Sequence, residues 1–503
     1  IFSTCTILLI FSNFKMSISS FIKKYLDGKS LKARALSGGM WLGAGGGVEQ
    51  GLRLLRNMIL ARILAPEAFG LMAIIIAVNS ALEAFTQIGI KEAIIQNPKG
   101  EEKTYLNGAW WLSFSRSVGL FLIGVISAPL IANYYEINNH LTILQLSFLS
   151  ILFNGAISAQ AYIAIKRMEY KKWVWIANGG GICGIVTAIS LSFFFENVWA
   201  LVIGFITEAI ARFILSFIIC PFIPQLKFDR VHLKALFRYA RGMFGLPILY
   251  LIFVQTDIFV IGKLFSKAEL GLYSLAVSLA QIPSQLIMTL LNPILMPVFS
   301  DKQNDKAWIN QALLKSTRVI ALAGTPLAFF IAFYGHDLLS IIYGAQYVSV
   351  AIPFAILFAS SLLRTCSAPI ANVYLAVGRP DLHRLFTGIR AILIILFIYP
   401  AIKWLGLTGA AIAGFLSMFL SYFFQVWQIR NLTNLDVRQY GTIFLQALSI
   451  SLLVGLFWLF TYNLLPSKPI INILQGLIGC LLCYGITIVF FKRKKAGEAF
   501  NLN

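Results

Sequence analysis

Apolar stretches of about 20 residues recur along almost the whole chain, and they restrict its possible folds more than any other feature. Each is long enough to cross a hydrocarbon layer roughly 30 Å thick as an α-helix. Hydrophobic residues make up 58% of the 503 residues and charged residues only 12%, whereas an ordinary soluble domain carries about 25% charged residues. The sequence therefore predicts an all-α integral membrane protein.

The polar boundaries of these stretches predict about 14 transmembrane helices. They begin near residues 36, 67, 105, 139, 172, 198, 234, 268, 307, 348, 381, 406, 438 and 468. Lys and Arg gather in alternate connections and in the KRKK tail at residues 492–495, whereas the opposite face carries only Lys263, Lys267, Lys403 and Lys468. Because short cytoplasmic loops are enriched in basic residues, both termini are expected in the cytoplasm.

The beginning of the chain needs its own interpretation, because the first methionine is Met16. The apolar run before it has neither a preceding basic region nor a clear small-residue cleavage site of the kind found in signal peptides. We interpret Met16 as the natural start. Residues 1–35 then form a cytoplasmic N-terminal segment, which includes a basic amphipathic stretch at the membrane surface.

Two internal matches indicate that the chain contains a repeat. AQAYIAIKRMEYKKW (residues 159–173) matches ANVYLAVGRPDLHRL (residues 371–385), and LAPEAFGLMA (64–73) more weakly matches FSKAELGLYSLA (265–276). Six predicted spans separate each segment from its copy, so the copies share an orientation and are related by an axis along the membrane normal. The predicted domains are an N-lobe of six helices (36–220), a C-lobe of six helices (233–430), two extra helices (437–492) and a cytoplasmic tail (493–503).

Several charged residues lie inside the predicted spans, where an ionised group costs roughly 2.5–3.5 kcal/mol even on the lenient insertion scale. Glu49, Arg53 and Arg56 fall within about 60° of one another on a helix. Glu83 belongs to a second polar stripe, which follows a four-residue step in the next span. Such residues normally face protein or water rather than lipid.

Ion pairing within a helix explains part of this charge, because Glu49 with Arg53 and Glu208 with Arg212 are spaced at i, i+4. Other arginines have no acidic neighbour in their own helices, and a cavity between the lobes with surplus positive charge would explain them. Arginine binds phosphate oxygens bidentately and stays charged, which suits a phosphate-bearing cargo. The candidate cargo-binding residues are Arg53, Arg56, Arg116, Lys315, Arg318, Arg364 and Arg390, and the candidate ion-coupling residues are Glu49, Glu83 and Asp257.

Two glycine-rich segments, residues 43–47 and 178–181, have two possible interpretations. They permit local bending during transport, or they serve ordinary close helix packing.

At the junction of the first two spans, LARILAPEAFGLMAI followed by IGIKEAIIQNP resembles the lipid-linked oligosaccharide flippases and exopolysaccharide exporters of the multidrug/oligosaccharidyl-lipid/polysaccharide superfamily. The resemblance implies a cargo made of a short oligosaccharide joined through pyrophosphate to a polyprenyl lipid. It implies rocker-switch transport across the bacterial inner membrane for O-antigen, capsule or exopolysaccharide biosynthesis, alongside a polysaccharide polymerase and a chain-length regulator.

Other functions are less consistent with the sequence. There is no phosphate loop for an ATPase, no metal-like histidine spacing and no implied cofactor, so net transport would depend on H⁺ or Na⁺ or on consumption of the product. The net charge of +21 is dispersed rather than gathered on one face, which argues against nucleic acid. A multidrug antiporter would favour an acidic or aromatic pocket, a lipid II flippase would share the pyrophosphate cargo, and a polymerase or ligase would need a larger external loop.

Overall fold

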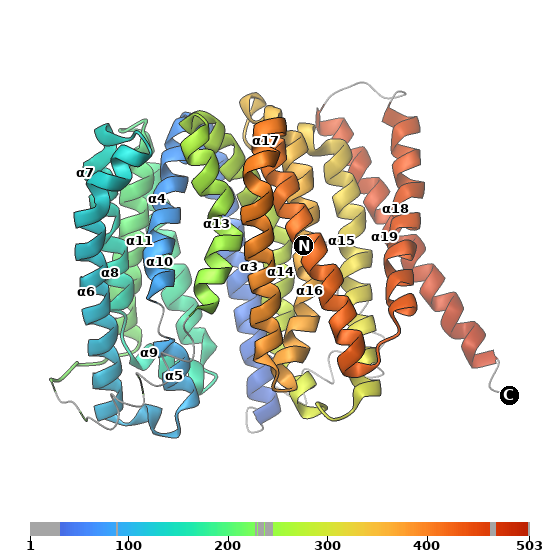
Figure 1. Cartoon of the computed structure of the whole chain (residues 1–503), viewed down its shortest axis with the longest axis horizontal. Helices are drawn as coiled ribbons and strands as arrows, with labels where there is room; N and C mark the ends of the chain where they lie inside the picture. Colours follow the sequence, from blue (N-terminus) through green and yellow to red (C-terminus); the bar gives the residue numbers. More distant parts are fainter. Residues whose placement is uncertain are drawn as a thin grey trace.

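The computed structural model describes residues 31–86, 89–226, 229, 236, 245–462 and 469–500, in which all regular structure is helical (Figure 1). The predictions for residues 1–30, including the start at Met16 and the amphipathic segment, lie outside the described residues. Within the described part, the prediction of an all-α fold is confirmed.

The helices of the N-terminal half are as follows: α3 (Leu31–Ile63), α4 (Pro66–Phe85), α5 (Ile90–Gln96), η1 (Pro98–Glu101), α6 (Lys103–Tyr134), η2 (Asn138–His140), α7 (Leu141–Ser147), α8 (Leu149–Gly155), α9 (Gln160–Lys166), α10 (Tyr170–Ser192) and α11 (Val198–Ile219). Those of the C-terminal half are α13 (Leu246–Leu264), α14 (Lys267–Asp301), α15 (Lys306–Ile342), η3 (Ala345–Val350), α16 (Ala351–Ala376), α17 (Pro380–Thr433), α18 (Val437–Tyr462) and α19 (Pro469–Phe500).

Ten helices of the described residues are long and apolar enough to cross a membrane, and the bent pair 138–155 and 160–166 makes an eleventh candidate. Most of the predicted starts agree with observed helix starts to within a few residues. The start predicted near 406 coincides with Gly406, where positive φ breaks α17 into two helices. The total of 14 spans stays a prediction, since charged residues interrupt the apolar run of α3 and, among the described side chains of α19, the apolar helix Pro469–Gly485 is shorter than the ten spans.

Local sequence signals explain where the two helices that carry the weaker repeat begin. Helix α4 begins with Pro66 in its first turn, where the missing N–H has no helical partner to lose. Helix α14 begins with a capping box, in which the Ser266 hydroxyl accepts from the Glu269 amide and the Glu269 carboxylate accepts from the Ser266 amide. These starts at residues 66 and 267 agree with the register in which LAPEAFGLMA matches FSKAELGLYSLA.

The stronger repeat marks the correct element but not the correct register. Both copies end a helix with the same turn, in which the Glu169 amide donates to Ala164 O and the Arg379 amide donates to Tyr374 O. Met168 and Gly378 provide the left-handed residue of each turn. Glu169 therefore corresponds to Arg379, two residues away from the correspondence that the sequence match gave.

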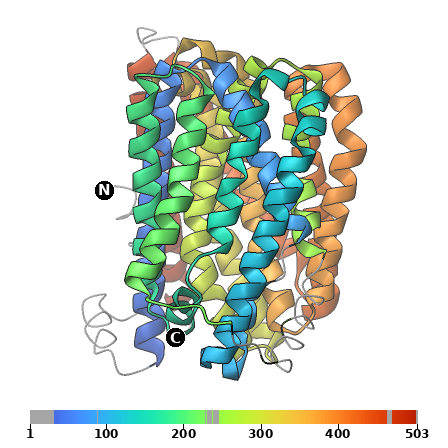
Figure 2. The same ribbon diagram turned by 90° about the vertical axis from the view of Figure 1, so that its left-hand side faces the viewer.

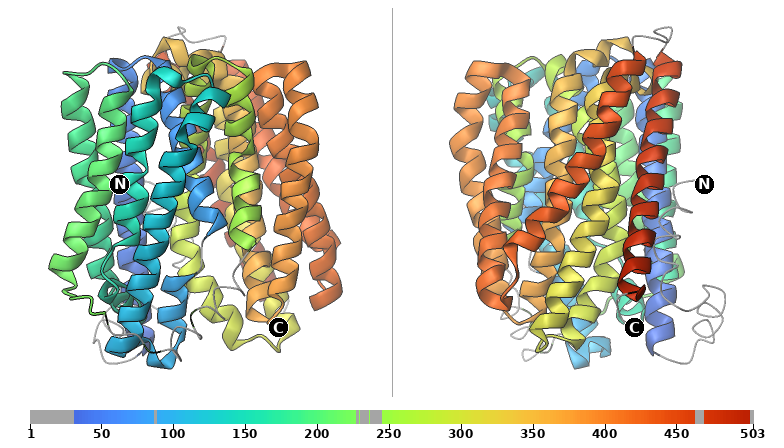
Figure 3. Two further views of the ribbon diagram at one scale, coloured as in Figure 1. Left: turned by 60° about the vertical axis from the view of Figure 1, so that its left-hand side comes forward. Right: turned by 90° about the vertical axis from the view of Figure 1, so that its right-hand side faces the viewer.

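The two halves pack together through a few helices near the middle of the bundle. Helix α4 packs against α13 and α14, and α3 lies between α10 and α14. Figure 2 looks onto the N-terminal half, formed outside α3 and α4 by α6 to α11. On the opposite side, α18 and α19 pack against α15 (Figure 3). These contacts agree with a bundle made of two groups of helices and a C-terminal pair, although the domain boundaries stay predictions.

Candidate functional site

The charged stripe of α3 combines an ion pair with a neighbouring arginine. Arg53 donates to the Glu49 carboxylate at 2.9 Å, and the two side chains are 47% and 31% exposed. Arg56 donates to Asn57 Oδ1 through Nε and Nη2, both at 3.2 Å, and interacts electrostatically with Glu208 of α11. The structure therefore connects Arg56 to an acidic residue that its own helix does not supply.

Glu208 is itself engaged by Arg212, at 2.5 Å, as the i, i+4 spacing predicts. This pair lies against the second glycine-rich segment. A Cβ at Gly180 would lie 2.3 Å from Arg212 Cγ, and one at Gly184 would lie 2.7 Å from Glu208 Cβ. Gly180 and Gly184 thus allow α10 and α11 to approach closely, which favours the packing interpretation of residues 178–181.

The first glycine-rich segment also makes helix contacts. A Cβ at Gly45 would lie 2.6 Å from Val174 of α10, and one at Gly46 would lie 2.7 Å from Thr289 of α14. Asn178 of α10 donates to Gly45 O at 3.1 Å. The part of α3 that carries Gly45 and Gly46 is therefore covered by neighbouring helices rather than facing open space.

A second charged cluster joins α4 and α6. The Arg116 Nε donates to the Thr86 hydroxyl at 3.0 Å, and Arg116 interacts electrostatically with Glu83. Arg116 has no acidic neighbour in α6, but the fold supplies one from α4. These two predicted site residues, one for cargo and one for ion coupling, are brought together.

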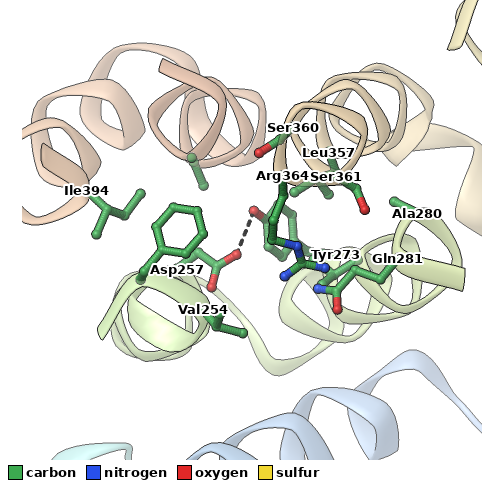
Figure 4. Close-up of a pocket in the computed structure, with 14 residues that line it drawn as sticks. Val254, Asp257, Tyr273, Ala280, Gln281, Leu357, Ser360, Ser361, Arg364 and Ile394 are labelled. Atoms are coloured by element: carbon green, nitrogen blue, oxygen red, sulfur yellow. Dashed lines mark hydrogen bonds between the residues drawn. The ribbon is translucent and has the colours of Figure 1, made fainter. Parts of the chain in front are cut away.

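A third cluster lines a pocket within the C-terminal half. Asp257 of α13, Tyr273 of α14 and Arg364 of α16 face it, and Tyr273 donates a 3.0 Å hydrogen bond to Asp257 Oδ2 (Figure 4). The Ile258 amide also donates to Asp257, at 2.8 Å. The pocket measures about 60 Å³, enough for a few water molecules but far too small for an oligosaccharide.

This arrangement confines a carboxylate and a guanidinium to one small space whose walls are mainly apolar. Gln281, Ser360 and Ser361 add polar groups to its wall. The lining residues come from α13, α14, α16 and α17, so this pocket does not lie between the halves. The predicted interlobe cavity stays a prediction.

Arg390 lies near Arg364, but the N–H groups of Arg390 donate hydrogen bonds to side chains on neighbouring helical segments. It donates to Ser367 of α16 at 2.7 Å, and to Ser421 at 3.2 Å and Gln425 at 3.4 Å, both in the second part of α17. Ser367 also donates to Gln425, at 2.7 Å. These neutral acceptors stabilise the charge of Arg390 and hold α16 against both parts of α17.

The remaining two candidates lie elsewhere. Lys315 and Arg318 belong to α15, whose neighbours include α16, α18 and α19, and neither lines the pocket described above. The structure thus divides the predicted cargo-binding residues among separate clusters. Their assignment to cargo binding, and that of Glu49, Glu83 and Asp257 to ion coupling, stays a prediction.

Sequence reasoning did not single out Tyr273, Gln281, Ser367 or Gln425. The importance of Tyr273, Ser367 and Gln425 comes from partners on other helices, and that of Gln281 from its place in the pocket wall. The weaker repeat offered one signal for Tyr273, which lies two residues after Gly271, the glycine that both copies of the repeat contain. Within the described residues, no group of three or more His, Cys, Asp or Glu residues is placed to hold a metal ion.

The fold of the chain is similar to that of solved membrane transporters. The chain resembles the lipid II flippase MurJ in its inward closed conformation with a TM-score of 0.74 at 15% identity, over 91% of this chain and 100% of that one. It resembles an inward-facing multidrug resistance MATE family transporter of the MOP superfamily with a TM-score of 0.58 at 14% identity, over 76% and 96% of the two chains. The chain therefore shares its helical fold with these two proteins.

Two sequence relatives are named for polysaccharide biosynthesis. The chain is 26% identical to the succinoglycan biosynthesis transport protein ExoT of Rhizobium meliloti (strain 1021), over 59% of this chain and 60% of that protein. It is 22% identical to the lipopolysaccharide biosynthesis protein WzxC of Escherichia coli (strain K12), over 82% and 84% of the two chains. The model of one family, described as polysaccharide biosynthesis protein, matches residues 59–352, more than half of the chain, and the chain belongs to this family.

Proposed function

We propose that this protein flips a polyprenyl-pyrophosphate-linked oligosaccharide across the bacterial inner membrane by alternating access, for O-antigen, capsule or exopolysaccharide biosynthesis. The names of ExoT and WzxC support the substrate class, and the transporter fold supports the mode of action. The structural observation that carries the proposal is Arg364, which points into a pocket that it shares with Asp257 (Figure 4).

In the proposed mechanism, guanidinium groups bind the pyrophosphate while the sugar passes through space that opens between the two halves. The lipid tail stays among the membrane lipids. Arg364 suits the phosphate because no hydrogen bond or ion pair among the described residues occupies it, and a guanidinium is more weakly hydrated than an ammonium group. Arg53 and Arg56 are the corresponding candidates in the N-terminal half. Rocking of the halves then exposes the cargo on the other side.

Asp257 is the proposed coupling residue. Binding of H⁺ or Na⁺ removes its net negative charge and so changes the electrostatic field on Arg364. With this charge neutralised, Arg364 attracts the cargo phosphate more strongly. Glu49 and Glu83 are less suitable, because Arg53 pairs with the first and Arg116 lies near the second.

We further propose that both termini lie in the cytoplasm, on the basis of the Lys and Arg distribution. In this orientation, α4 and α14 begin at the external face of the membrane. A polymerase and a chain-length regulator would act on the cargo after it reaches that face.

The test uses purified protein in proteoliposomes with a fluorescent polyprenyl-pyrophosphate oligosaccharide, and measures cargo binding and transfer between leaflets. Arg364→Ala is expected to weaken binding and transfer, whereas Arg384→Ala, which removes an exposed arginine at the start of α17, leaves both unchanged. The same lipid without its pyrophosphate should not bind. Equal transfer by wild type and Arg364→Ala would overturn the assignment.

Two alternatives are outcomes of the same assay. Lipid II transfer in preference to the oligosaccharide lipid would identify a lipid II flippase, which the similarity to MurJ favours. Uptake of a cationic dye driven by an ion gradient would identify a multidrug antiporter, which the similarity to a MATE transporter favours.

A further inference from the structure

The first turns of α4 and α14 contact each other through two glycines in a reciprocal arrangement. A Cβ added at Gly70 would lie 1.8 Å from Lys267 O, and a Cβ added at Gly271 would lie 1.8 Å from Pro66 O. The same added atoms would lie 3.1 Å from the Gly271 amide nitrogen and 3.0 Å from the Gly70 amide nitrogen. Each helix therefore touches the backbone of the other at the position where its partner has no side chain.

This contact relates the two copies of the internal repeat. Gly70 and Gly271 are equivalent in the match of LAPEAFGLMA to FSKAELGLYSLA, as are Pro66 and Lys267. Equivalent residues that contact each other reciprocally must lie close to the axis that relates their elements. The axis between the two halves therefore passes near these glycines.

Three polar contacts join the two halves around the same end of the bundle. Arg62 donates to Ile341 O at 2.7 Å, and the side-chain Nε2 of Gln346 donates to Ala61 O at 3.4 Å. Lys263 at the end of α13 pairs with Glu136 after α6, at 2.8 Å. All these residues lie near helix termini at the end where α4 and α14 begin.

We propose that the contact of Gly70 with Gly271 closes this end of the transport path and must separate for the path to open there. When the two halves rock against each other, they tilt about an axis parallel to the membrane, and the separation at this end of the bundle changes directly. Helices that touch through backbone seal without a gap, because no side chain stands between them. The inference goes beyond the proposed function, as it identifies which backbone contact closes the path and is independent of the cargo.

A methyl group at either glycine would prevent this closure. To reach ordinary van der Waals contact at 3.4 Å, α4 and α14 would have to move apart by about 1.6 Å at this point. The obstacle is backbone rather than a flexible side chain, so local adjustment cannot relieve it. Gly119 and Gly181 provide matched controls, because a Cβ at either would meet nothing within 4 Å.

The test measures access to a buried position below the contact. Ala77 lies two turns beyond Gly70 on the same face of α4 and is 0% exposed. In a variant whose native cysteines are replaced by alanine, the thiol introduced by Ala77→Cys is labelled with a membrane-impermeant maleimide, in intact cells and in inverted vesicles. Labelling needs no cargo, so its result is distinct from that of the transfer assay.

Gly70→Ala and Gly271→Ala are expected to raise the labelling rate of the introduced thiol several-fold from one side of the membrane, and from the outside if the termini are cytoplasmic. Gly119→Ala and Gly181→Ala should leave it unchanged. Glu136→Gln, at a side chain that is 79% exposed, removes one of the surrounding links without affecting packing and should raise labelling by a smaller factor. Protection of the introduced thiol in both glycine variants that reach the membrane, or in Glu136→Gln if neither does, would overturn the proposal.

Discussion

The guanidinium of Arg390 on α17 donates a 2.7 Å hydrogen bond to the Ser367 hydroxyl on α16. Its further bonds to Ser421 and Gln425 reach the second part of α17, across the break at Gly406. Arg390 therefore connects three helical segments, and this role in stability is separate from any role in binding cargo.

Replacing Arg390 with alanine should lower stability, because Ser367, Ser421 and Gln425 lose a charged donor inside the helix bundle. The expected loss is about 1–3 kcal/mol, measured as a lower melting temperature in detergent. Arg390→Lys should recover part of it, since lysine keeps the charge but not the planar fork. Arg364→Ala, which removes none of these bonds, serves as the control and should melt close to the wild type.

Exchanging the charges of Glu49 and Arg53 distinguishes a structural ion pair from a cargo site. In the variant Glu49→Arg with Arg53→Glu, the i, i+4 pair can form again in the opposite order, so protein level and melting temperature should stay near those of the wild type. Cargo transfer should fall, because the arginine has moved by about one helical turn, roughly 6 Å along the axis. Restoration of transfer by the double exchange would show that the pair serves structure alone.

Arg62 should contribute to stability but not to cargo affinity. Its side chain bonds a carbonyl in the last turn of α15, where the helix dipole favours a positive charge. Arg62→Gln should cost about 1 kcal/mol of unfolding free energy, with unchanged affinity for the pyrophosphate lipid in a binding assay. Weaker binding at unchanged melting temperature would contradict this.

The contact between η1 and the end of α9 should weaken in acid. Arg167 donates to Glu101 at 2.6 Å and holds the pKa of that carboxyl below its ordinary value. A carboxyl whose pKa is lower in the folded state stabilises the fold above its unfolded pKa, and this contribution disappears as the pH falls through the folded pKa. The difference in melting temperature between Glu101→Gln and the wild type should therefore be smaller at about pH 4 than at about pH 7.

Helix positions were predictable from the sequence because apolar length and basic loops act locally. The starts predicted near 198, 268 and 438 agree with helices beginning at Val198, Lys267 and Val437. The break at Gly406 was also anticipated, as a boundary between spans. The turn after α9 was less predictable in detail, because residue identity placed the repeat two positions away from the backbone correspondence.

The candidate site was predictable only as a list of charged residues. Helical spacing identified the pairs Glu49 with Arg53 and Glu208 with Arg212, and both are formed. Spacing within one helix says nothing about partners on other helices. Arg116 therefore looked isolated although Glu83 lies near it, and Arg390 looked available for cargo although Ser367 and Gln425 occupy it.

The glycine contact between α4 and α14 has a consequence for how such transporters diversify. It is made by main-chain atoms, which every amino-acid sequence shares. The seal itself therefore does not distinguish one cargo from another by its chemistry. Substitutions that adapt the protein to a new sugar can accumulate in side chains elsewhere without disturbing it. Only the two positions that must lack a side chain are constrained, and selectivity and closure can therefore evolve independently.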